Sequence, residues 1–384
     1  MQSTLPELLA QYGRILQRCL FPRLEEELGP LTAKHQQVVR VLGLLDLNAL
    51  IPSTRGEVGR PRQDRRALAR AFVAKAVYNF PFTRTLRDHL HADSRLRRIC
   101  GWESVRAIPD ESVFSRAFAE FAETELPQRL HLALVAKTQS NRLIGHLSRD
   151  STAIVVRERP AKRAAGVAQG AAQPPTGEAV HRQGKRRRSP RRQGKGRRGP
   201  RRRTRIERQL TQQSVPEMLA ELPRDCDIGC KTNSQGRKET WRGYKLHLDV
   251  ADGQIPISCV LTSASLHDSQ VAIPLATLSA QRVTSLYDLM DSGYDCQWIR
   301  QHSRSLGHVP IIEEQDRRYK AALPMAPHQA TRFRERTAVE RVNARLKDEF
   351  GGRNVRVRGW KKVMAHLMFG VLALTVDQLL RLAT

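Results

Sequence analysis

The spacing of apolar residues divides the chain into a helical first part, a stretch with almost nothing to bury, and a mixed second part. Up to about residue 140, apolar positions recur every three or four residues, which is typical of amphipathic helices. From residue 143 onward, short alternating or continuous apolar runs indicate strands. In the first part we predict helices over residues 5–28, 35–47, 63–78, 83–91, 111–121 and 126–137.

The second part mixes strands and helices. We predict strands over residues 143–156, 241–250, 255–261, 285–290 and 308–312, and helices over residues 269–280, 295–305, 333–350 and 364–383. Antiparallel strands followed by crossover helices indicate an α/β core, a mixed sheet with helices on both faces, preceded by an all-helical N-terminal domain. The last helix is very apolar, but polar residues and Gly370 interrupt it, so we expect a buried core helix and no membrane span.

The region between the two parts is strongly basic. Residues 159–206 contain the run KRRRSPRRQGKGRRGPRRRTR and little to bury, so we expect a disordered insertion. The whole chain has a net charge of +28 and a pI of about 10.9, which favours a polyanion partner, most often nucleic acid. A ribosomal-type or membrane-surface protein is the alternative class. The insertion is either an arm that binds DNA phosphates or a solvated linker. Its candidate DNA contacts are Arg186, Arg187, Arg188, Arg201, Arg202 and Arg203.

Cysteine usage and the first residues of the chain say little about function. Six cysteines are scattered, and the closest pair, Cys226 and Cys230, has no second pair nearby, so a structural zinc site is not expected. We expect reduced thiols in a cytoplasmic protein. The first 16 residues lack a charged region followed by an apolar core, so we do not expect a signal peptide.

Residues 333–350 carry the clearest candidate chemistry. Arg336, Glu340, Asn343 and Lys347 recur three or four residues apart and fall on one helical stripe. Such a stripe can offer a carboxylate ligand flanked by cations, as a site that cuts phosphodiesters requires. The alternative is an exposed helix with ordinary charge pairs between successive turns.

The spacing Arg336, three residues, Glu340, six residues, Lys347 resembles the Tyr-Arg-Glu-Lys signature of bacterial insertion-sequence transposases with an RNase H-like DDE core. Phe333 stands where the signature has Tyr, which keeps the ring and loses the hydroxyl. The order of predicted strands and helices is also that of an RNase H-like fold. In the second part, Asp291-Ser-Gly-Tyr-Asp is similar to the second motif of this family, and residues 262–268 resemble a family segment that leads into a helix.

The resemblance implies a catalytic triad. Asp150 in the first strand, Asp291 at the end of the fourth strand and Glu340 on the later helix would be the catalytic residues and the ligands of two Mg²⁺ ions, with Mn²⁺ as a substitute. Each acid also has an ordinary interpretation. Asp150 would be a strand-end turn former, Asp291 a helix N-cap, and Glu340 a partner of Arg336 or Lys347. Asp288, Asp268 and Glu349 are the substitutes if one assignment fails.

Further DNA contacts follow from the resemblance. Arg336 and Lys347 would bind phosphate, and Phe333 and Trp360 would stack an unpaired base or pack in the core. Residues 108–118 resemble an N-terminal element of the same transposases, with Asp110 as N-cap and Arg116 on the following helix. This region is either a helix-turn-helix or a packing domain without base readout.

The sequence thus predicts a helical DNA-binding domain at 1–140, an RNase H-like DDE domain at 141–158 and 207–384, and the insertion at 159–206. The expected function is binding of the terminal inverted repeats, then Mg²⁺-dependent cleavage and strand transfer into target DNA. The expected state is a homodimer on paired ends, at the bacterial nucleoid in the cytoplasm. The alternatives are an RNase H-like nuclease without end specificity and a non-catalytic DNA-binding derivative. Only 49 positions separate Asp291 from Glu340, which leaves no room for a large β-rich insertion.

Overall fold

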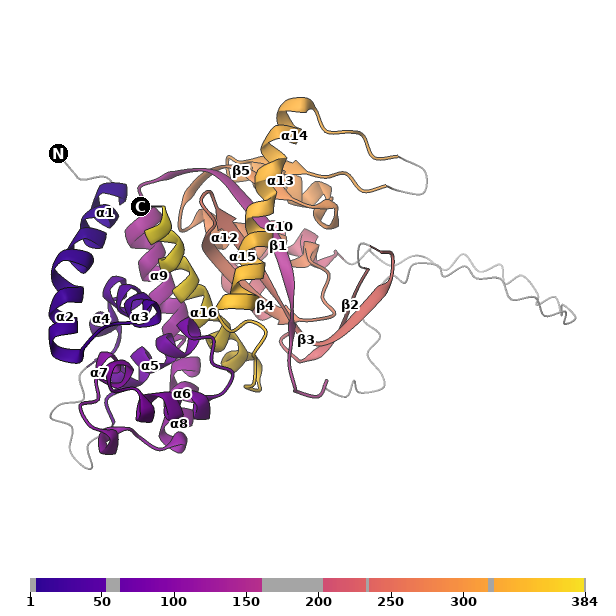
Figure 1. The fold of residues 1–384 in the computed structure, drawn as a ribbon. Helices are drawn as coiled ribbons and strands as arrows, with labels where there is room; N and C mark the ends of the chain where they lie inside the picture. The colour runs from indigo at the N-terminus through magenta and orange to yellow at the C-terminus, as the bar shows by residue number, and fades with distance from the viewer. Residues whose placement is uncertain (1–4, 53–62, 161–202, 233–234, 317–320, 383–384) are drawn as a thin grey trace, which may run out of the picture.

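The computed structural model describes residues 5–52, 63–160, 203–232, 235–316 and 321–382. Helices gather on one side of the molecule and the sheet on the other, and the C-terminal helix runs between them (Figure 1). Most of the basic insertion, residues 161–202, lies outside the described residues. Near the end of the insertion, Thr204 and Glu207 form a capping box that starts helix α10 (Arg205–Thr211).

The first part is helical, as predicted. The predicted helix over residues 5–28 is α1 (Leu5–Ile15) and α2 (Phe21–Leu28), joined by a π-helical turn (Leu16–Leu20). The helices that follow are α3 (Ala33–Leu44), α4 (Leu47–Leu50), α5 (Arg65–Val77), α6 (Thr83–Ala92), α7 (Ser94–Cys100), α8 (Glu111–Glu123) and α9 (Leu126–Gln139). Asp110 occupies the N-cap position of α8 without a side-chain cap bond, and instead lies 3.7 Å from Arg87.

The second part is built on a six-stranded mixed sheet. Its strands are β1 (Leu143–Val155), β2 (Asp227–Thr232), β3 (Lys238–Ala251), β4 (Ile255–Ser263), β5 (Thr284–Met290) and β6 (Val309–Ile312). The order is β4, β3, β1, β5, β6, with β2 paired to the first half of β3. The first three are antiparallel neighbours, whereas β5 and β6 run parallel to β1. This confirms the predicted mixed sheet.

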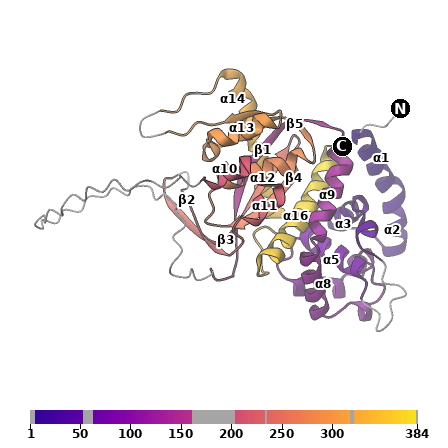
Figure 2. The same ribbon diagram turned by 180° about the vertical axis from the view of Figure 1, so that it is seen from behind.

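Helices cover both faces of this sheet. Helix α15 (Thr337–Glu349) crosses one face (Figure 1), and α12 (Ser269–Ala280), with α10, α11 (Val215–Ala220) and α13 (Gln297–Ser305), covers the other (Figure 2). At Gly243, φ is +149° and a Cβ would lie 2.0 Å from the carbonyl oxygen of Ile154, so only glycine lets β3 pass β1 there.

The predicted helix over residues 333–350 is broken at its start. Helix α14 (Pro327–Phe333) is followed by a 3₁₀ turn (Arg334–Arg336), and α15 begins only at Thr337. Two contacts hold this tight turn: Thr337 donates from its hydroxyl to the carbonyl of Arg334 at 3.0 Å, and Ser148 donates to that of Glu335 at 3.1 Å. The break is therefore fixed by a contact with β1 that helical periodicity does not reveal.

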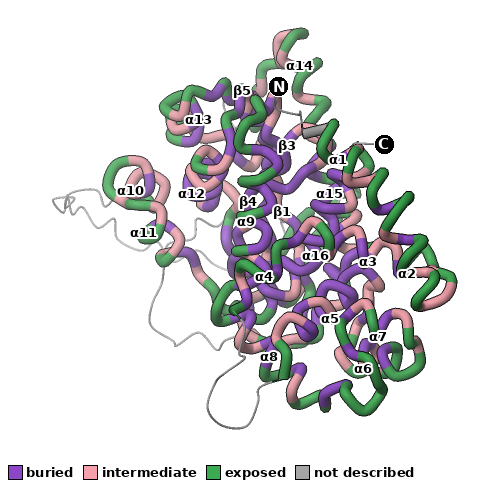
Figure 3. The backbone as a smooth tube through the Cα atoms, turned by 90° about the vertical axis from the view of Figure 1, so that its left-hand side faces the viewer, coloured by how far each residue is buried: buried purple, intermediate pink, exposed green. Residues whose placement is uncertain are grey.

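The C-terminal helix α16 (Trp360–Arg381) joins the helical side to the sheet. It packs against α9, α5, α8 and α3, and also against β4 and α15. By length and composition α16 could cross a membrane, but 83% of its apolar window is buried inside the protein, as predicted for a core helix. Figure 3 shows this buried interior along α16 and the central strands. At Gly370 a Cβ would lie 2.4 Å from the carbonyl oxygen of Phe350, so glycine permits the close approach of the two chain segments.

Candidate carboxylate site

Asp150 and Asp291 lie on neighbouring parallel strands at the same level. Arg149 of β1 is in register with Met290, the last residue of β5, so Asp150 on β1 and Asp291 directly after β5 follow this pair. The carboxyl end of β5 falls at this point, as expected for a ligand site in an open sheet. Asp291 also accepts a hydrogen bond from the backbone N–H of Gly293 at 3.0 Å and so caps the 3₁₀ turn Ser292–Tyr294. Asp291 thus caps this short turn, whereas the N-cap position of the following helix is Cys296. The capping bond uses Oδ1 and is compatible with a second role.

The two acids stand in an environment that opposes their ionisation. Burial, with added repulsion from Asp291 and Asp268, raises the pKa of Asp150 to about 7 against the attraction of Arg336. Burial, with repulsion from Asp268 and Glu313, also raises the pKa of Asp291, again opposed by Arg336. Clustered carboxylates of this kind are stabilised in their charged form by any cation that enters among them.

Helix α15 carries the third predicted acid, Glu340, which pairs with an arginine. Val339, Val342 and Leu346 are buried and pack α15 against β1 and β3. The Glu340 side chain, 49% exposed, accepts a hydrogen bond from Arg336 one turn earlier. This is the ordinary helical pairing considered for Glu340.

One guanidinium therefore faces all three acids. Arg336 bonds Glu340 directly, and its charge also acts on Asp150 and Asp291. Asn343, one turn beyond Glu340, donates from Nδ2 to Oδ2 of Asp150 at 3.2 Å. Among the residues that the structure describes, no three His, Cys, Asp or Glu side chains form a group that could hold a metal ion. Arg336 is therefore the cation common to the three acids.

Asp268 joins the cluster from the loop before α12. Burial raises its pKa, but His247, Lys245 and a hydrogen bond from Ser151 together hold the pKa below its usual range. Lys245 donates to its Oδ1 at 2.9 Å. The segment TSASLHD signalled this loop, but its closeness to Asp150 and Asp291 depends on the fold. The Tyr294 hydroxyl, buried beside these acids, has no hydrogen-bond partner in the described structure.

The other two substitute acids are occupied elsewhere. Asp288 is buried in β5, and its Oδ1 lies 3.2 Å from Nδ1 of His308. Glu349 pairs with Arg345 at the far end of α15.

The predicted DNA-contacting residues fall into three groups. Lys347 is near Asp150, and burial together with the cations Lys231 and Arg353 lowers its pKa. Phe333 is half-buried, with the Arg336 guanidinium 5.6 Å from its ring centre. Arg116 on α8 and Arg203 are exposed. Arg186, Arg187, Arg188, Arg201 and Arg202 lie outside the described residues.

Trp360 is engaged within the fold. Its indole N–H donates to the carbonyl of Leu261 at 2.8 Å, and Arg224 lies 4.5 Å from its ring centre. These contacts favour the packing interpretation of Trp360 over stacking on a base.

Comparison with known families identifies both parts of the chain. Residues 226–376 match the family described as Transposase DDE domain, and residues 26–120 match the family described as Transposase domain (DUF772). The first match contains Asp291 and Glu340, whereas strand β1 with Asp150 lies before the matched residues. No match to the chain was found among curated proteins or among solved structures. The two family matches identify this chain as a transposase with a DDE domain, in keeping with the insertion-sequence DDE transposases.

Proposed function

We propose that this transposase binds the terminal inverted repeats of an insertion sequence, cuts the DNA strand at each end, and joins the freed 3′-hydroxyl to target DNA. The observation that supports this most directly is the placement of Asp150 and Asp291 side by side, with Arg336 reaching both of them and Glu340. Clustered carboxylates at the carboxyl end of a central strand, in a chain with a DDE domain, favour phosphoryl transfer.

The catalytic core is proposed to be RNase H-like. The strand order β4, β3, β1, β5, β6 supports this, since an antiparallel three-stranded unit continues into two parallel strands through helical crossovers. On this proposal β1 belongs to the catalytic domain at 141–158 and 207–384, although a basic insertion at 159–206 separates it from the rest. Residues 1–140 would form the DNA-binding domain.

Asp150, Asp291 and Glu340 would hold two Mg²⁺ ions, or Mn²⁺ in their place. All their donors are oxygens, which Mg²⁺ prefers, and the raised pKa values of both aspartates are what a site that requires a cation would show in its absence. When bound, the ions supply charge neutralisation at the attacking and leaving oxygens of the phosphodiester. Arg336 bonds only Oε1 of Glu340, so the second carboxylate oxygen of Glu340 would be available to an ion. Arg336 would also bind a DNA phosphate.

The residues of the chain have distinct proposed roles around this chemistry. Asn343 orients Asp150, and Lys347 supplies a point charge beside it. Phe333 keeps the guanidinium of Arg336 in place or stacks on a base near the cut. Arg116 and the arginines of the insertion would contact the backbone of double-stranded DNA, both element ends and target. Two ends must be held together, so a homodimer on DNA at the bacterial nucleoid is proposed.

The test is transfer of a labelled element end into a plasmid in the presence of Mg²⁺. We expect Glu340→Ala to remove transfer while binding to the end is retained, because Glu340 is exposed and carries no packing role. Unselective degradation of DNA by the wild type would instead favour a nuclease of the same fold. Tight end binding without any transfer would favour a non-catalytic derivative.

A further inference from the structure

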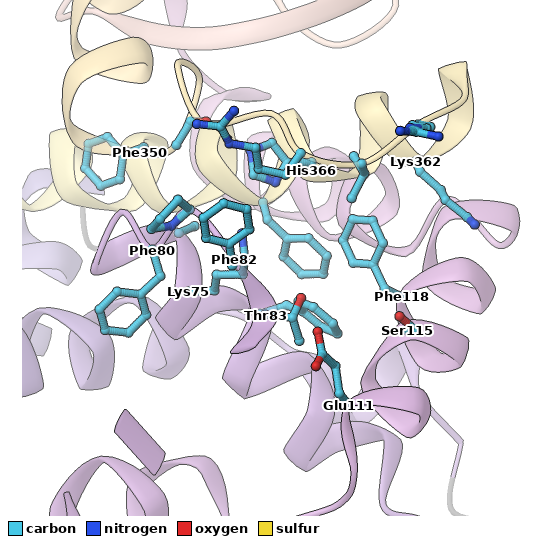
Figure 4. Close-up of a pocket in the computed structure, with 18 residues that line it drawn as sticks. Lys75, Phe80, Phe82, Thr83, Glu111, Ser115, Phe118, Phe350, Lys362 and His366 are labelled. Atoms are coloured by element: carbon cyan, nitrogen blue, oxygen red, sulfur yellow. The ribbon is translucent and has the colours of Figure 1, made fainter. Parts of the chain in front are cut away.

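A second site lies apart from the carboxylates, between the helical side and the chain after α15. It is a pocket of about 550 Å³ formed by α5, α6 and α8 on one side and by residues 350–358 and the first turns of α16 on the other (Figure 4). A volume of this size is typical of pockets that bind small organic groups. Neither the family matches nor the carboxylate chemistry assigns it a role.

Aromatic side chains form much of its wall. Phe80, Phe82, Phe118 and Phe350 line it and come from three separate segments of the chain. Phe82, just before α6, is 44% exposed, whereas Phe80, Phe118 and Phe350 are buried. The guanidinium of Arg356 lies 5.4 Å from the ring centre of Phe82, on the rim of the pocket. An exposed aromatic ring beside a guanidinium is a stacking platform for a flat, polarisable group.

A buried cation lines the same pocket. The Lys75 side chain on α5 is only 8% exposed, yet it makes no hydrogen bond or ion pair within the described structure. Its neighbour His366 is bonded to the carbonyl of Gly351 at 3.0 Å, and burial followed by the repulsion of Lys75 lowers the pKa of His366 to about 3. A buried, unpaired ammonium is costly unless an anion neutralises it. Among the described residues, therefore, no acid pairs with the Lys75 ammonium that lines the pocket.

The charged side chains around the pocket are mostly cationic. Arg356, Arg358 and Lys362 line it together with Lys75, and the single acid in the lining, Glu111, lies across the pocket from His366 (Figure 4). Four cations against one carboxylate favour an anionic ligand. The combination of aromatic walls and cations matches one nucleotide, whose base is flat and whose phosphate is anionic.

We propose that this pocket binds a single unstacked nucleotide of the DNA substrate, with its base on Phe82 and its phosphate held by Lys75 and Arg356. The inference rests on the proposed function, because it takes DNA as the substrate. Helix α15 connects the two sites: Asn343 contacts Asp150, and Phe350 lines the pocket. A nucleotide held there would fix the distance between an anchored base and the strand that is cut.

The test compares three duplexes of the same sequence by fluorescence anisotropy: one fully paired, one with a single unpaired thymidine, and one with an abasic residue at that position. Base stacking on an aromatic side chain contributes about 1–3 kcal/mol, so we expect the thymidine bulge to bind about tenfold tighter than the abasic bulge. Phe82→Ala should remove that difference and leave binding of the paired duplex unchanged. Phe82→Trp should keep it.

Lys75→Met and Lys137→Met form a matched pair, since both remove one ammonium but Lys137 is exposed on α9. Lys75→Met should weaken binding of the thymidine bulge, and Lys137→Met should not. Equal affinity of the wild type for the thymidine and abasic bulges would contradict the proposal that the pocket binds a nucleotide. A Phe82→Ala variant that weakens binding of all three duplexes alike would contradict it as well. If the wild type binds none of the duplexes, the proposed DNA substrate itself fails, and the pocket with it.

Discussion

The side-chain amide of Asn343 donates a hydrogen bond to Asp150 at 3.2 Å and so joins helix α15 to strand β1 at the carboxylate cluster. Asn343 is 6% exposed, and its Oδ1 has no hydrogen-bond partner in the described structure. A buried acceptor without a partner costs free energy. Packing of α15 therefore does not explain an asparagine at this position, whereas orientation of Asp150 does.

We expect Asn343→Ala to lower the rate of strand cleavage about tenfold with little change in the free energy of unfolding. A hydrogen bond to a charged group contributes about 1.5 kcal/mol, but the variant also removes the unpaired acceptor, so the two effects on stability oppose each other. The rate is measured at saturating DNA, and unfolding by urea. Arg341→Ala, on the exposed face of the same helix, is the control. A cleavage rate that Asn343→Ala leaves unchanged would contradict the positioning role.

A divalent cation should stabilise the folded protein. Mg²⁺ or Mn²⁺ relieves the repulsion that raises the pKa of Asp150 and of Asp291, so it binds the folded state in preference to the unfolded one. At a concentration one hundred times Kd this gives about 2.7 kcal/mol. We expect Tm to rise with added Mn²⁺ in the wild type and not in Asp150→Asn or Asp291→Asn. Asp88→Asn, at an exposed position on α6, should behave as the wild type. An equal rise in all four proteins would place the cation elsewhere.

The sequence was sufficient for the elements that position the two aspartates. Continuous apolar runs predicted β1 and β5, and the register of these strands then brings Asp150 and Asp291 together. Strand β2 was missed because its only large apolar residue, Ile228, is 55% exposed and gives no burial pattern. Helices α7, α10 and α11 were missed because short, charged segments show little helical periodicity.

The sequence did not predict which way the side chains of the site point. The stripe that contains Arg336, Glu340 and Asn343 was predicted from spacing alone. Spacing alone cannot tell whether the Glu340 side chain contacts Asp150 or Arg336. In the structure Glu340 accepts a hydrogen bond from Arg336, and Asn343 donates the hydrogen bond to Asp150. Asp268 likewise has no periodic signal, because it reaches the cluster only through the fold of the loop before α12.

Stability should depend on the ionisation of Lys75. Burial lowers the pKa of this side chain to about 8, from 10.5 in the unfolded chain. Below pH 8 both states carry the proton and the folded state bears the full cost of the buried charge. Between pH 8 and 10.5 only the unfolded state keeps the proton, so the cost diminishes and stability rises with pH. We expect Lys75→Met to be more stable than the wild type by up to about 3 kcal/mol at pH 7.

The difference between the two proteins should decrease above pH 8 and vanish near pH 10.5. Urea unfolding at a series of pH values measures it, and taking the difference cancels the tyrosines that titrate in the same range. Lys137→Met, which removes an exposed ammonium from α9, is the control. A Lys75→Met protein less stable than the wild type at pH 7 would mean that the ammonium has an internal partner.

Phe333 offers a direct comparison with the family signature, which has Tyr there. Phe333→Tyr keeps the ring beside Arg336 and adds a hydroxyl that can donate to a DNA phosphate, so we expect tighter binding of DNA by about fivefold. Phe333→Ala loses the contact between ring and guanidinium, which contributes about 0.5–1 kcal/mol, and should weaken binding by about two- to fivefold. Gel-shift titrations measure both. If the two variants weaken binding equally, Phe333 is a packing residue whose shape alone matters.

The basic insertion should contribute affinity without sequence preference. Arg203, the one candidate arginine of the insertion within the described residues, is exposed and lies 3.3 Å from Thr211, so its charge is not neutralised by an acid there. Each phosphate contact changes the slope of log K against log salt by about 0.9 on duplex DNA. Replacing Arg186, Arg187, Arg188, Arg201, Arg202 and Arg203 by Gln should therefore flatten the slope by up to about five.

Replacing the same six arginines by Lys should preserve the slope, because counter-ion release depends on charge. Cleavage at saturating DNA should be equal in both variants, since neither touches the carboxylates. A Gln variant with the slope of the wild type would identify the insertion as a solvated linker and assign DNA affinity to the helical domain.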